Sequence, residues 1–244
     1  MPDTARPGGP WDESALSKLE AWDPAWAKAV SKAADDAWTG GVLSRKFVEL
    51  VSLGINVACT NLNADGTRRN IRGALAAGAS RDEILFVIKC ATAMALHAMS
   101  LGAPILLEEA KAADVALKIP RSAATPAIDE MKAIGQWNAA WNGFLALDPA
   151  WTDVFMGMGA GIYGSGVMPP KETELLSIAF DASFTHMYAP GTRRHIQNAL
   201  KAGATPEEIF EVLKICVAQG VQAINLGVPI LEEELAARAT DGVR

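Results

Sequence analysis

KETELLSIAFDASFTHMYAPGTRRHIQNALKAGATPEEI occupies residues 171–209, and KFVELVSLGINVACTNLNADGTRRNIRGALAAGASRDEI occupies residues 46–84. Both stretches begin with Lys-x-x-Glu-Leu, and both contain Gly-Thr-Arg-Arg followed by Ala-Gly-Ala. The match extends without a gap from residues 23–109 onto residues 148–234, and roughly two positions in five are identical. The chain therefore contains an internal duplication with an offset of 125 residues.

Apolar residues recur with a helical period in each copy. We expect buried, strongly apolar helices over about 44–61 and 170–187. Asp65-Gly66 and Pro190-Gly191 should break the chain, so that Thr67 or Thr192 caps the following helix.

Further helix boundaries are expected at both ends of the repeats. Gly78 and Gly203 should end a helix in the left-handed conformation. Ser80 and Thr205 each open a capping box, in which a glutamate three residues later bonds back to the cap. Near the C-terminal end of each repeat, the Gly-x-Pro sequences should bend or restart the last helix.

No segment shows sustained β alternation, so the predicted fold is all-α with two tandem repeats. Residues 1–10 are predicted to be a disordered tail, and residues 116–124 a linker. The first repeat is assigned to residues 11–115 and the second to residues 125–244.

Composition excludes several classes of protein. The net charge of −6 argues against a nucleic-acid partner. No run of roughly 18 apolar residues is evident, so no membrane span is expected. Cys59, Cys90 and Cys216 form no CxxC pair, and we expect all three to be buried, reduced thiols of a cytoplasmic protein.

Glu174 stands among leucines and isoleucine in its helix. A carboxylate there is either paired or has its pKa raised by burial, and both states suit general acid–base catalysis. The alternative is a structural ion pair with Lys171, Arg193 or Arg194, and the presence of Glu49 at the same position of the first repeat supports it.

Arg193 and Arg194 are expected in the first turn of a helix, where two guanidiniums and free backbone amides would bind a substrate carboxylate. The alternative is that they bind Glu207, Glu208 or acidic residues of a neighbouring subunit.

The histidines distinguish the two repeats. His195 aligns with Asn70, and His186 aligns with Asn61. Asparagine keeps a hydrogen-bonding side chain but exchanges no proton near neutral pH, whereas imidazole does. Proton-transfer chemistry is therefore predicted for the second repeat, with sequence drift at purely structural positions as the alternative.

Metal binding is not expected. His186 and His195 are nine residues apart and belong to no metal-ligand motif. The third histidine, His97, aligns with Gln222 and is expected to be a packed core or interface residue.

Lys171-x-x-Glu174-Leu, followed by His195-x-x-x-Ala-x-x-x-Gly-Ala-Thr-x-Glu-Glu-Ile, resembles the carboxymuconolactone decarboxylase (AhpD-like) family. The resemblance covers both repeats and implies an AhpD-like helical fold. It also implies ring-shaped oligomers, here a homotrimer that forms a pseudo-hexameric ring. The peroxidase branch carries a CxxC before the motif histidine. This chain has none, which disfavours thiol peroxidase activity because the attacking and resolving thiols are missing.

The resemblance implies a cofactor-independent decarboxylase for a small carboxylated lactone from aromatic breakdown, with 4-carboxymuconolactone as the reference substrate. In that reading, Arg193 and Arg194 hold a carboxylate, His195 moves the proton and Glu174 orients or relays. His186 is a second donor or polarises the lactone carbonyl. The active site is expected in the second repeat, and the site of the first repeat is expected to be degenerate. Two alternatives stay open: a lactone hydrolase or isomerase, and a non-catalytic ring-forming binding protein in which the glutamates and arginines of both repeats are structural.

Overall fold

The computed structural model describes residues 8–118 and 123–241, and within these ranges every regular element is a helix. The described chain divides into two compact units, a larger one up to Ile88 and from Pro170 onward, and a smaller one over Lys89–Pro169. The all-α prediction is confirmed.

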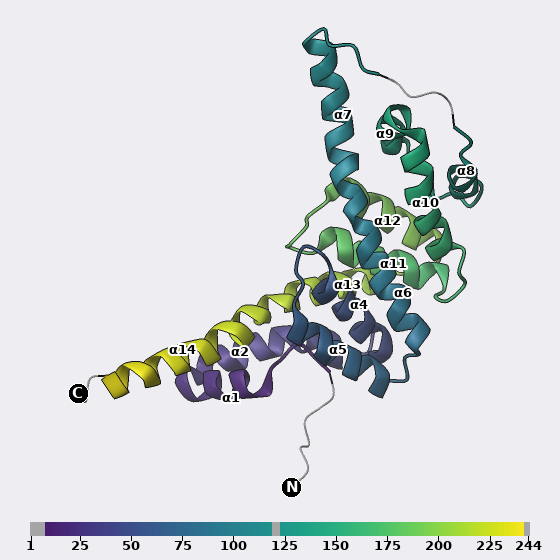
Figure 1. Cartoon of the computed structure of the whole chain (residues 1–244). Coiled ribbons are helices and arrows are strands. Elements are labelled where there is room, and N and C mark those ends of the chain that lie inside the picture. Colours follow the sequence, from purple (N-terminus) through teal and green to yellow (C-terminus); the bar gives the residue numbers. More distant parts are fainter. Residues whose placement is uncertain (1–7, 119–122, 242–244) are drawn as a thin grey trace. The chain divides into compact units, whose positions relative to one another are not determined.

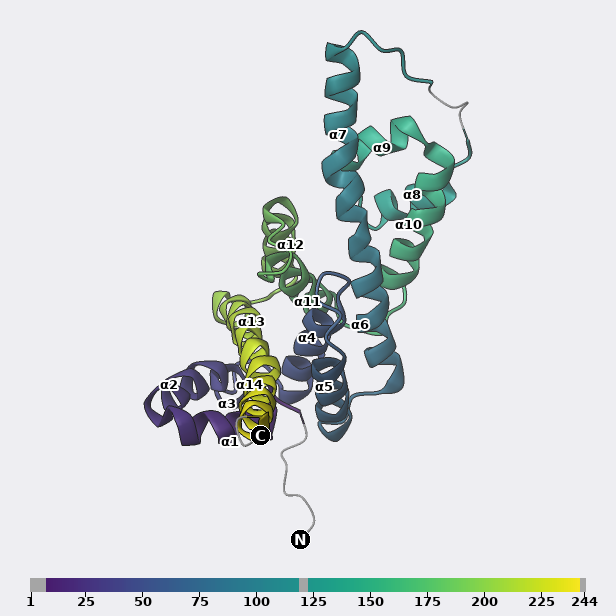
Figure 2. The same cartoon turned by 60° about the vertical axis from the view of Figure 1, so that its left-hand side comes forward.

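The larger unit holds the helices of the two stretches 46–84 and 171–209, together with the N-terminal and C-terminal helices (Figure 1). They are α1 (Glu13–Trp22), α2 (Pro24–Ala34), α3 (Asp36–Thr39), α4 (Arg45–Val57), α5 (Ala64–Ala76), α11 (Pro170–Ala182), α12 (Ala189–Lys201), α13 (Pro206–Ala218), the 3₁₀ turn η3 (Gln219–Val221) and α14 (Gln222–Asp241). Helix α6 (Arg81–Ala93) begins in this unit and ends in the smaller one. Helix α1 packs on both α2 and α14, as Figure 2 shows.

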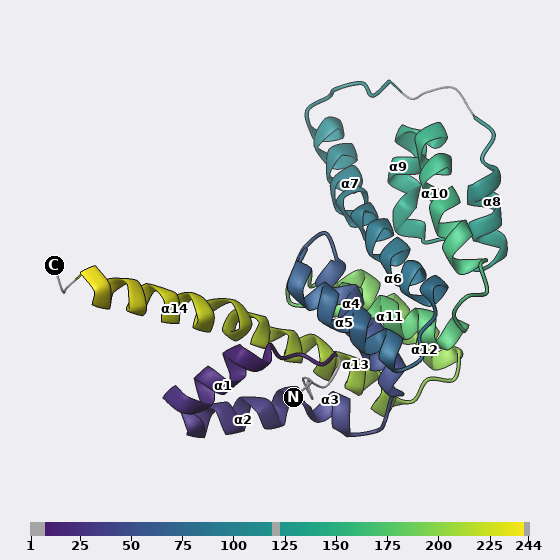
Figure 3. The same cartoon turned by 60° about the horizontal axis from the view of Figure 1, so that its bottom comes forward.

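The smaller unit has its own apolar core, and its helices are drawn in teal and green in Figure 3. Its elements are η1 (Met94–Leu96), α7 (His97–Ala112), α8 (Pro126–Ala133), η2 (Ala139–Trp141), α9 (Asn142–Leu147) and α10 (Pro149–Tyr163). Ile128, Phe144 and Met156 are completely or almost completely buried between α8, α9 and α10. His97, expected to be packed, is half-buried at the start of α7.

The two repeats are units of sequence and not of packing. Helices α4 and α5 of the first repeat share the larger unit with α11 to α14 of the second. The predicted linker, residues 116–124, lies partly outside the described residues. So does most of the predicted tail, but Gly8–Pro10 are described, and the prediction of disorder is wrong for them. The Gly9 amide donates to Glu49 Oε1 at 2.9 Å, and Asn225 donates to the carbonyl of Pro10 at 2.8 Å.

Several predicted helix ends are confirmed. Gly78 and Gly203 have φ of +89° and +86°, the left-handed conformation that glycine adopts without strain. Both capping boxes are present, with Glu83 bonded to Ser80 and Glu208 to Thr205.

Other predicted boundaries are wrong. Asn63, rather than Thr67, caps α5, and α12 begins at Ala189 after Tyr188, so Thr192 is no cap. In the last helix of each repeat the interruption is a 3₁₀ turn that comes before the Gly-x-Pro sequence, at η1 and η3. Proline then lies inside α7 and α14 without ending them.

Helices α4 and α11, the matching helices of the two repeats, pack directly on each other. A methyl group on Gly54 would lie 3.0 Å from the Phe180 ring, so the close approach of the two helices requires glycine there. Nearby, Thr60 Oγ1 and Thr185 Oγ1 are 3.2 Å apart, although 125 residues separate them. Equivalent residues meet at the same point, which indicates that the repeats pack about an approximate two-fold axis.

Two continuous helical stretches, residues 81–112 and 206–239, are long and apolar enough to cross a bilayer by length and composition alone. This differs from the expectation that no such stretch exists. Core helices of soluble proteins pass the same test, and 39% and 50% of the two apolar windows are buried within the protein.

We predict that Gly54→Ala lowers the free energy of unfolding by about 1–3 kcal/mol, because the added methyl group must push the α4–α11 contact apart. Gly102→Ala in α7 is the matched control, since a methyl group there meets open space. It should raise stability by about 0.5–1 kcal/mol through helix propensity. Urea denaturation of both variants tests this. Equal effects of the two substitutions would show that α4 and α11 are not in tight contact.

Candidate active site

A buried hydrogen bond joins α11 to α12 in the second repeat. His195 Nδ1 lies 2.6 Å from Glu174 Oε2, and the two residues are only 5% and 4% exposed. Asn198, one turn further along α12, donates to the other carboxylate oxygen of Glu174 at 3.4 Å. The expected pairing of imidazole and buried glutamate is thus present, and the alternative of an ion pair with Lys171 is wrong. Lys171 bonds Glu208 instead, at 2.8 Å.

Arg194 fixes the tautomer of His195. Its Nη2 atom lies 3.0 Å from His195 Nε2. Because a guanidinium only donates, Nε2 must be the accepting nitrogen, and the proton of the neutral ring sits on Nδ1. The Nδ1–H group then donates to Glu174. This arrangement leaves His195 with a basic nitrogen held in a defined direction.

The surroundings of His195 favour the neutral ring. Burial lowers the pKa of His195, the hydrogen bond to Glu174 raises it, and the charge of Arg194 lowers it again. The resulting pKa lies below the ordinary value of 6.5. At neutral pH His195 is therefore a proton acceptor.

Asp181 is a site residue that the sequence prediction missed. Its Oδ2 atom lies 3.7 Å from His195 Nε2, and the residue is 2% exposed. Burial raises the pKa of Asp181 to about 7, although the charge of Arg194 acts in the opposite direction. A carboxyl group with this pKa is half protonated at neutral pH and suits proton donation.

A signal for Asp181 was present in the sequence. It aligns with Asn56 of the first repeat. Asp181 is therefore the third position, after His186 and His195, at which the second repeat has a titratable group and the first repeat has an asparagine. The side chain at this position also explains why both repeats have glycine in Gly-Thr-Arg-Arg. A methyl group on Gly191 would collide with Asp181 Oδ2, and one on Gly66 would lie 2.5 Å from Asn56 Oδ1.

His186 lies in the turn between α11 and α12. The backbone amide of Tyr188 donates to the carbonyl of Asp181 at 2.7 Å, and that of His186 donates to Ser183 at 2.8 Å. This turn brings a ring nitrogen of His186 within 4.8 Å of a carboxylate oxygen of Asp181. His186 is half-buried, and burial lowers its pKa. Asp181 therefore stands between the two histidines of the second repeat.

The two predicted arginines have different surroundings. Both lie in the second turn of α12, because this helix begins at Ala189, so the prediction that they lie in the first turn is wrong. Arg194 is half-buried beside His195, whereas Arg193 is exposed.

Arg193 lines a pocket of about 540 Å³ on the outer side of α12. The other lining residues are mostly apolar, and they are Ala182, Met187, Ala189, Thr192, Ile196 and Gln197. His195 and Glu174 are not among them. Asp181 and His186 are not lining residues either, but each directly precedes one in the chain, Ala182 and Met187 respectively.

In the first repeat the equivalent glutamate is a purely structural group. Glu49 is completely buried and accepts hydrogen bonds from Gly9 N, Trp38 Nε1, Arg45 and Asn70 Nδ2, all between 2.7 and 3.0 Å. Four of these contacts end on Oε1 and the bond from Asn70 ends on Oε2, so the carboxylate is compensated by fixed donors and is not exposed to a substrate.

The cysteines take no part in the described cluster. Cys90 and Cys216 are buried as expected, and burial raises the pKa of each thiol to about 12. Cys59 is exposed, so the prediction is wrong for this residue. It follows α4 directly, in the turn that leads to Asn61.

We predict that Asp181→Asn stabilises the protein above pH 7. In the folded state this carboxyl group has a pKa of about 7, against 3.8 when unfolded, so between these values only the folded state keeps the proton. Stability therefore falls as pH rises from about 4 to 7, by on the order of 4 kcal/mol. Asparagine, which the first repeat has at this position, does not ionise, so the variant does not lose this stability as the pH rises.

Urea denaturation at pH 5 and pH 8 tests the prediction, with the exposed Asp129→Asn as control. Parallel stability curves for Asp181→Asn and the wild type would contradict it.

Comparisons with known proteins identify the family of the chain. The sequence model of the carboxymuconolactone decarboxylase family matches residues 24–103 and 149–233, more than half of the chain. A crystal structure from Burkholderia xenovorans LB400, provisionally named a gamma-carboxymuconolactone decarboxylase subunit, is similar with a TM-score of 0.84 and 32% identity. The similarity covers 92% of this chain and 91% of that one. The curated proteins contain no match. The chain belongs to the carboxymuconolactone decarboxylase family.

Proposed function

We propose that the chain is a cofactor-independent decarboxylase whose working site lies in the second repeat. Its substrate would be a small carboxylated lactone or a related acid from aromatic catabolism. One observation carries the proposal. Glu174, His195 and Asp181 form a buried cluster of titratable groups with the half-buried His186 beside it, and three of these four positions hold an asparagine in the first repeat.

The pocket beside α12 has the chemistry that such a substrate needs. Its apolar walls suit a lactone ring, and Arg193 is the one cationic side chain among its lining residues. A guanidinium binds a carboxylate through two parallel hydrogen bonds. In this proposal Arg193 binds a carboxylate of the substrate, while Arg194 donates a hydrogen bond to His195.

The reaction requires one proton and no redox partner. The bond between the ring carbon and its carboxylate breaks, CO₂ leaves, and the electron pair stays on the ring and spreads into the lactone carbonyl. A proton then adds to carbon. Asp181 is the group in the described cluster that holds an available proton at neutral pH, and His186 would pass it to the substrate.

His195 would return Asp181 to its protonated state. The Nε2 atom accepts a proton from solvent and faces the Asp181 carboxylate, provided that Arg194 releases its hydrogen bond in that step. Glu174 acts as a positioning residue, because its bond to Nδ1–H keeps the ring in the required tautomer and stabilises the imidazolium that forms transiently.

An isomerase or hydrolase of a related lactone is the second candidate function. The accepting Nε2 atom of His195 supports it, because a general base that removes a proton from carbon or water needs this tautomer. Product analysis by NMR separates the two functions. A decarboxylase releases CO₂, whereas a hydrolase or an isomerase retains every carbon of the substrate.

We also propose the homotrimeric, pseudo-hexameric ring and the cytoplasmic location that the sequence predicts. The ring is supported by Phe210 and Val217, which are 60% and 76% exposed and lie seven residues apart on one face of α13. Large apolar side chains on one helix face are typical of an interface.

We predict that His195→Asn, which installs the residue of the first repeat, lowers kcat for 4-carboxymuconolactone at least tenfold. The far-UV circular dichroism should not change, because an amide can replace the hydrogen bond to Glu174. In the wild type, kcat should fall on both sides of an optimum. At low pH the neutral His195 is lost, and above about pH 7 the proton of Asp181 is lost. Unaltered turnover in the variant would remove His195 from the mechanism.

We predict that Arg193→Gln raises KM about tenfold or more, because a charge-assisted hydrogen bond to the substrate contributes about 1.5–3 kcal/mol. Arg68→Gln is the matched control. Arg68 occupies the same position of the first repeat and is also exposed, but it lies outside the pocket. Steady-state kinetics of the two variants should differ in KM. Equal KM values would show that the carboxylate binds elsewhere.

A further inference from the structure

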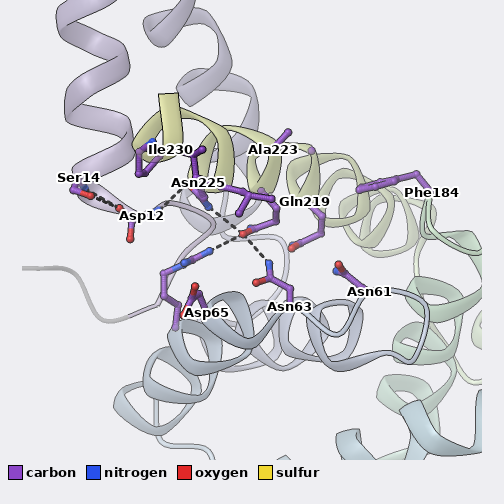
Figure 4. Close-up of a pocket in the computed structure, with 15 residues that line it drawn as sticks. Asp12, Ser14, Asn61, Asn63, Asp65, Phe184, Gln219, Ala223, Asn225 and Ile230 are labelled. Carbon is purple, nitrogen blue, oxygen red and sulfur yellow. Dashed lines mark hydrogen bonds between the residues drawn. The ribbon is translucent and has the colours of Figure 1, made fainter. Parts of the chain in front are cut away.

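A second pocket, of about 730 Å³, lies in the larger unit between the start of α5 and the start of α14 (Figure 4). Its polar side chains come from the first repeat and from the last helices of the second. The lining residues are Asp12, Ser14, Asn61, Asn63, Asp65, Arg69, Phe184, Gln219, Gly220, Gln222, Ala223, Asn225, Leu226, Pro229 and Ile230.

Two lining residues of this pocket align with residues at the buried cluster of the second repeat, namely Asn61 with His186 and Arg69 with Arg194. In addition, Gln222 aligns with His97, and Asn70, behind the pocket, aligns with His195. All three histidines of the chain thus have an amide at the equivalent position of the other repeat. Amide side chains donate and accept hydrogen bonds but transfer no proton near neutral pH. The pocket is therefore able to bind a polar molecule and unable to carry out the proton chemistry of the second repeat.

The amides are held rigidly by each other. Gln222 Oε1 accepts from Asn63, Asn225 and Arg69 at 2.7 to 3.0 Å, and Gln222 Nε2 donates to the carbonyl of Pro10 at 3.1 Å. Several of these dashed bonds are visible in Figure 4. A site whose side chains are fixed before binding loses little conformational freedom when a ligand enters.

Arg69 keeps donors for a ligand. Its Nη2 atom bonds Gln222 and Pro10, and its Nε atom is buried without a partner among the described residues. The two N–H groups of Nη1, which has no hydrogen bond to another described residue, are therefore the donors for a ligand. Burial lowers the pKa of Arg69, and the charges of Asp12 and Asp65 raise it. Two carboxylates therefore act on one guanidinium, and a ligand with several negative charges would be repelled.

Acceptors and an apolar wall complete the pocket. Asn61 donates through Nδ2 to the carbonyl of Ile55 at 3.1 Å, which leaves its Oδ1 atom free to accept from a ligand. The exposed carboxylate of Asp65 is a second acceptor. Phe184 and Ile230, 53% and 48% exposed, supply apolar surface.

We infer that this pocket binds, without converting it, a small uncharged carbonyl compound that carries a hydroxyl group, such as a hydroxylated lactone. The carbonyl oxygen of the ligand accepts from Arg69, its hydroxyl donates to Asn61 or Asp65, and its carbon skeleton packs on Phe184 and Ile230. The inference does not depend on the proposed decarboxylase activity, because it concerns binding in the other repeat.

D-pantolactone is a suitable probe, since it has one carbonyl, one hydroxyl and two methyl groups and is uncharged. For a molecule of this size we expect a Kd on the order of 1 to 10 mM. Saturation-transfer NMR on the full chain measures it directly. The ring-opened anion, pantoate, should bind at least threefold more weakly because of Asp12 and Asp65. Pantoate binding as well as the lactone would overturn the assigned ligand class.

Two variants test whether the probe binds in this pocket. Ala223→Trp fills the pocket without removing a hydrogen bond, and Arg69→Gln removes the guanidinium, so each should reduce the saturation-transfer signal at least fivefold. Their matched controls, Ala236→Trp on the exposed end of α14 and Arg68→Gln on α5, should bind as the wild type does. If Arg69→Gln fails to fold, Ala223→Trp decides alone. No signal with the wild type, or a full signal with Ala223→Trp, overturns the inference.

Discussion

The hydrogen bond between His195 Nδ1 and Glu174 Oε2 is the interaction on which the candidate site depends. A buried carboxylate without partners carries a large desolvation cost, so a glutamate in the core must be compensated by donors. Here the main donor is an imidazole, which supplies one N–H and keeps a second nitrogen for chemistry. Arg194 then fixes that nitrogen as an acceptor, and Asp181 lies beside it. The same hydrogen bond thus compensates the buried charge of Glu174 and orients His195 for the proposed catalysis.

The first repeat solves the same physical problem in another way. Glu49 receives its donors from a backbone amide, an indole, a guanidinium and an amide, and Gly8–Pro10 are held in place as part of the solution. All its partners are fixed donors, and none of them is an acid or a base near pH 7. The helix pair α4–α5 is therefore a stable scaffold for the helix pair α11–α12, against which α4 packs at Gly54. Duplication allows one copy to specialise in stability and the other in chemistry.

The same comparison explains the pocket of the first repeat. Amides replace the histidines but preserve hydrogen bonding, so the hollow stays polar and open while its proton chemistry is absent. An exact structural copy would have kept imidazole, and a purely structural remnant would have been filled by larger apolar side chains. The observed pocket, which is lined by amides and a guanidinium, resembles neither a catalytic copy nor a filled remnant. Its chemistry supports binding without turnover.

The sequence by itself determined the all-helical fold and the duplication, and its resemblance to a known family implied the partnership of Glu174 with His195. Apolar periodicity, capping residues and the match between the repeats are local or alignable properties, which need no knowledge of packing. It did not determine where helices end, as Thr67 and Thr192 show, because neighbouring side chains compete for the same cap. Only the tertiary structure decided that Asp181 joins the site and that Arg193 and Arg194 separate. A carboxyl's pKa and a guanidinium's partner depend on what surrounds them in space, and residues far apart in the chain supply those surroundings.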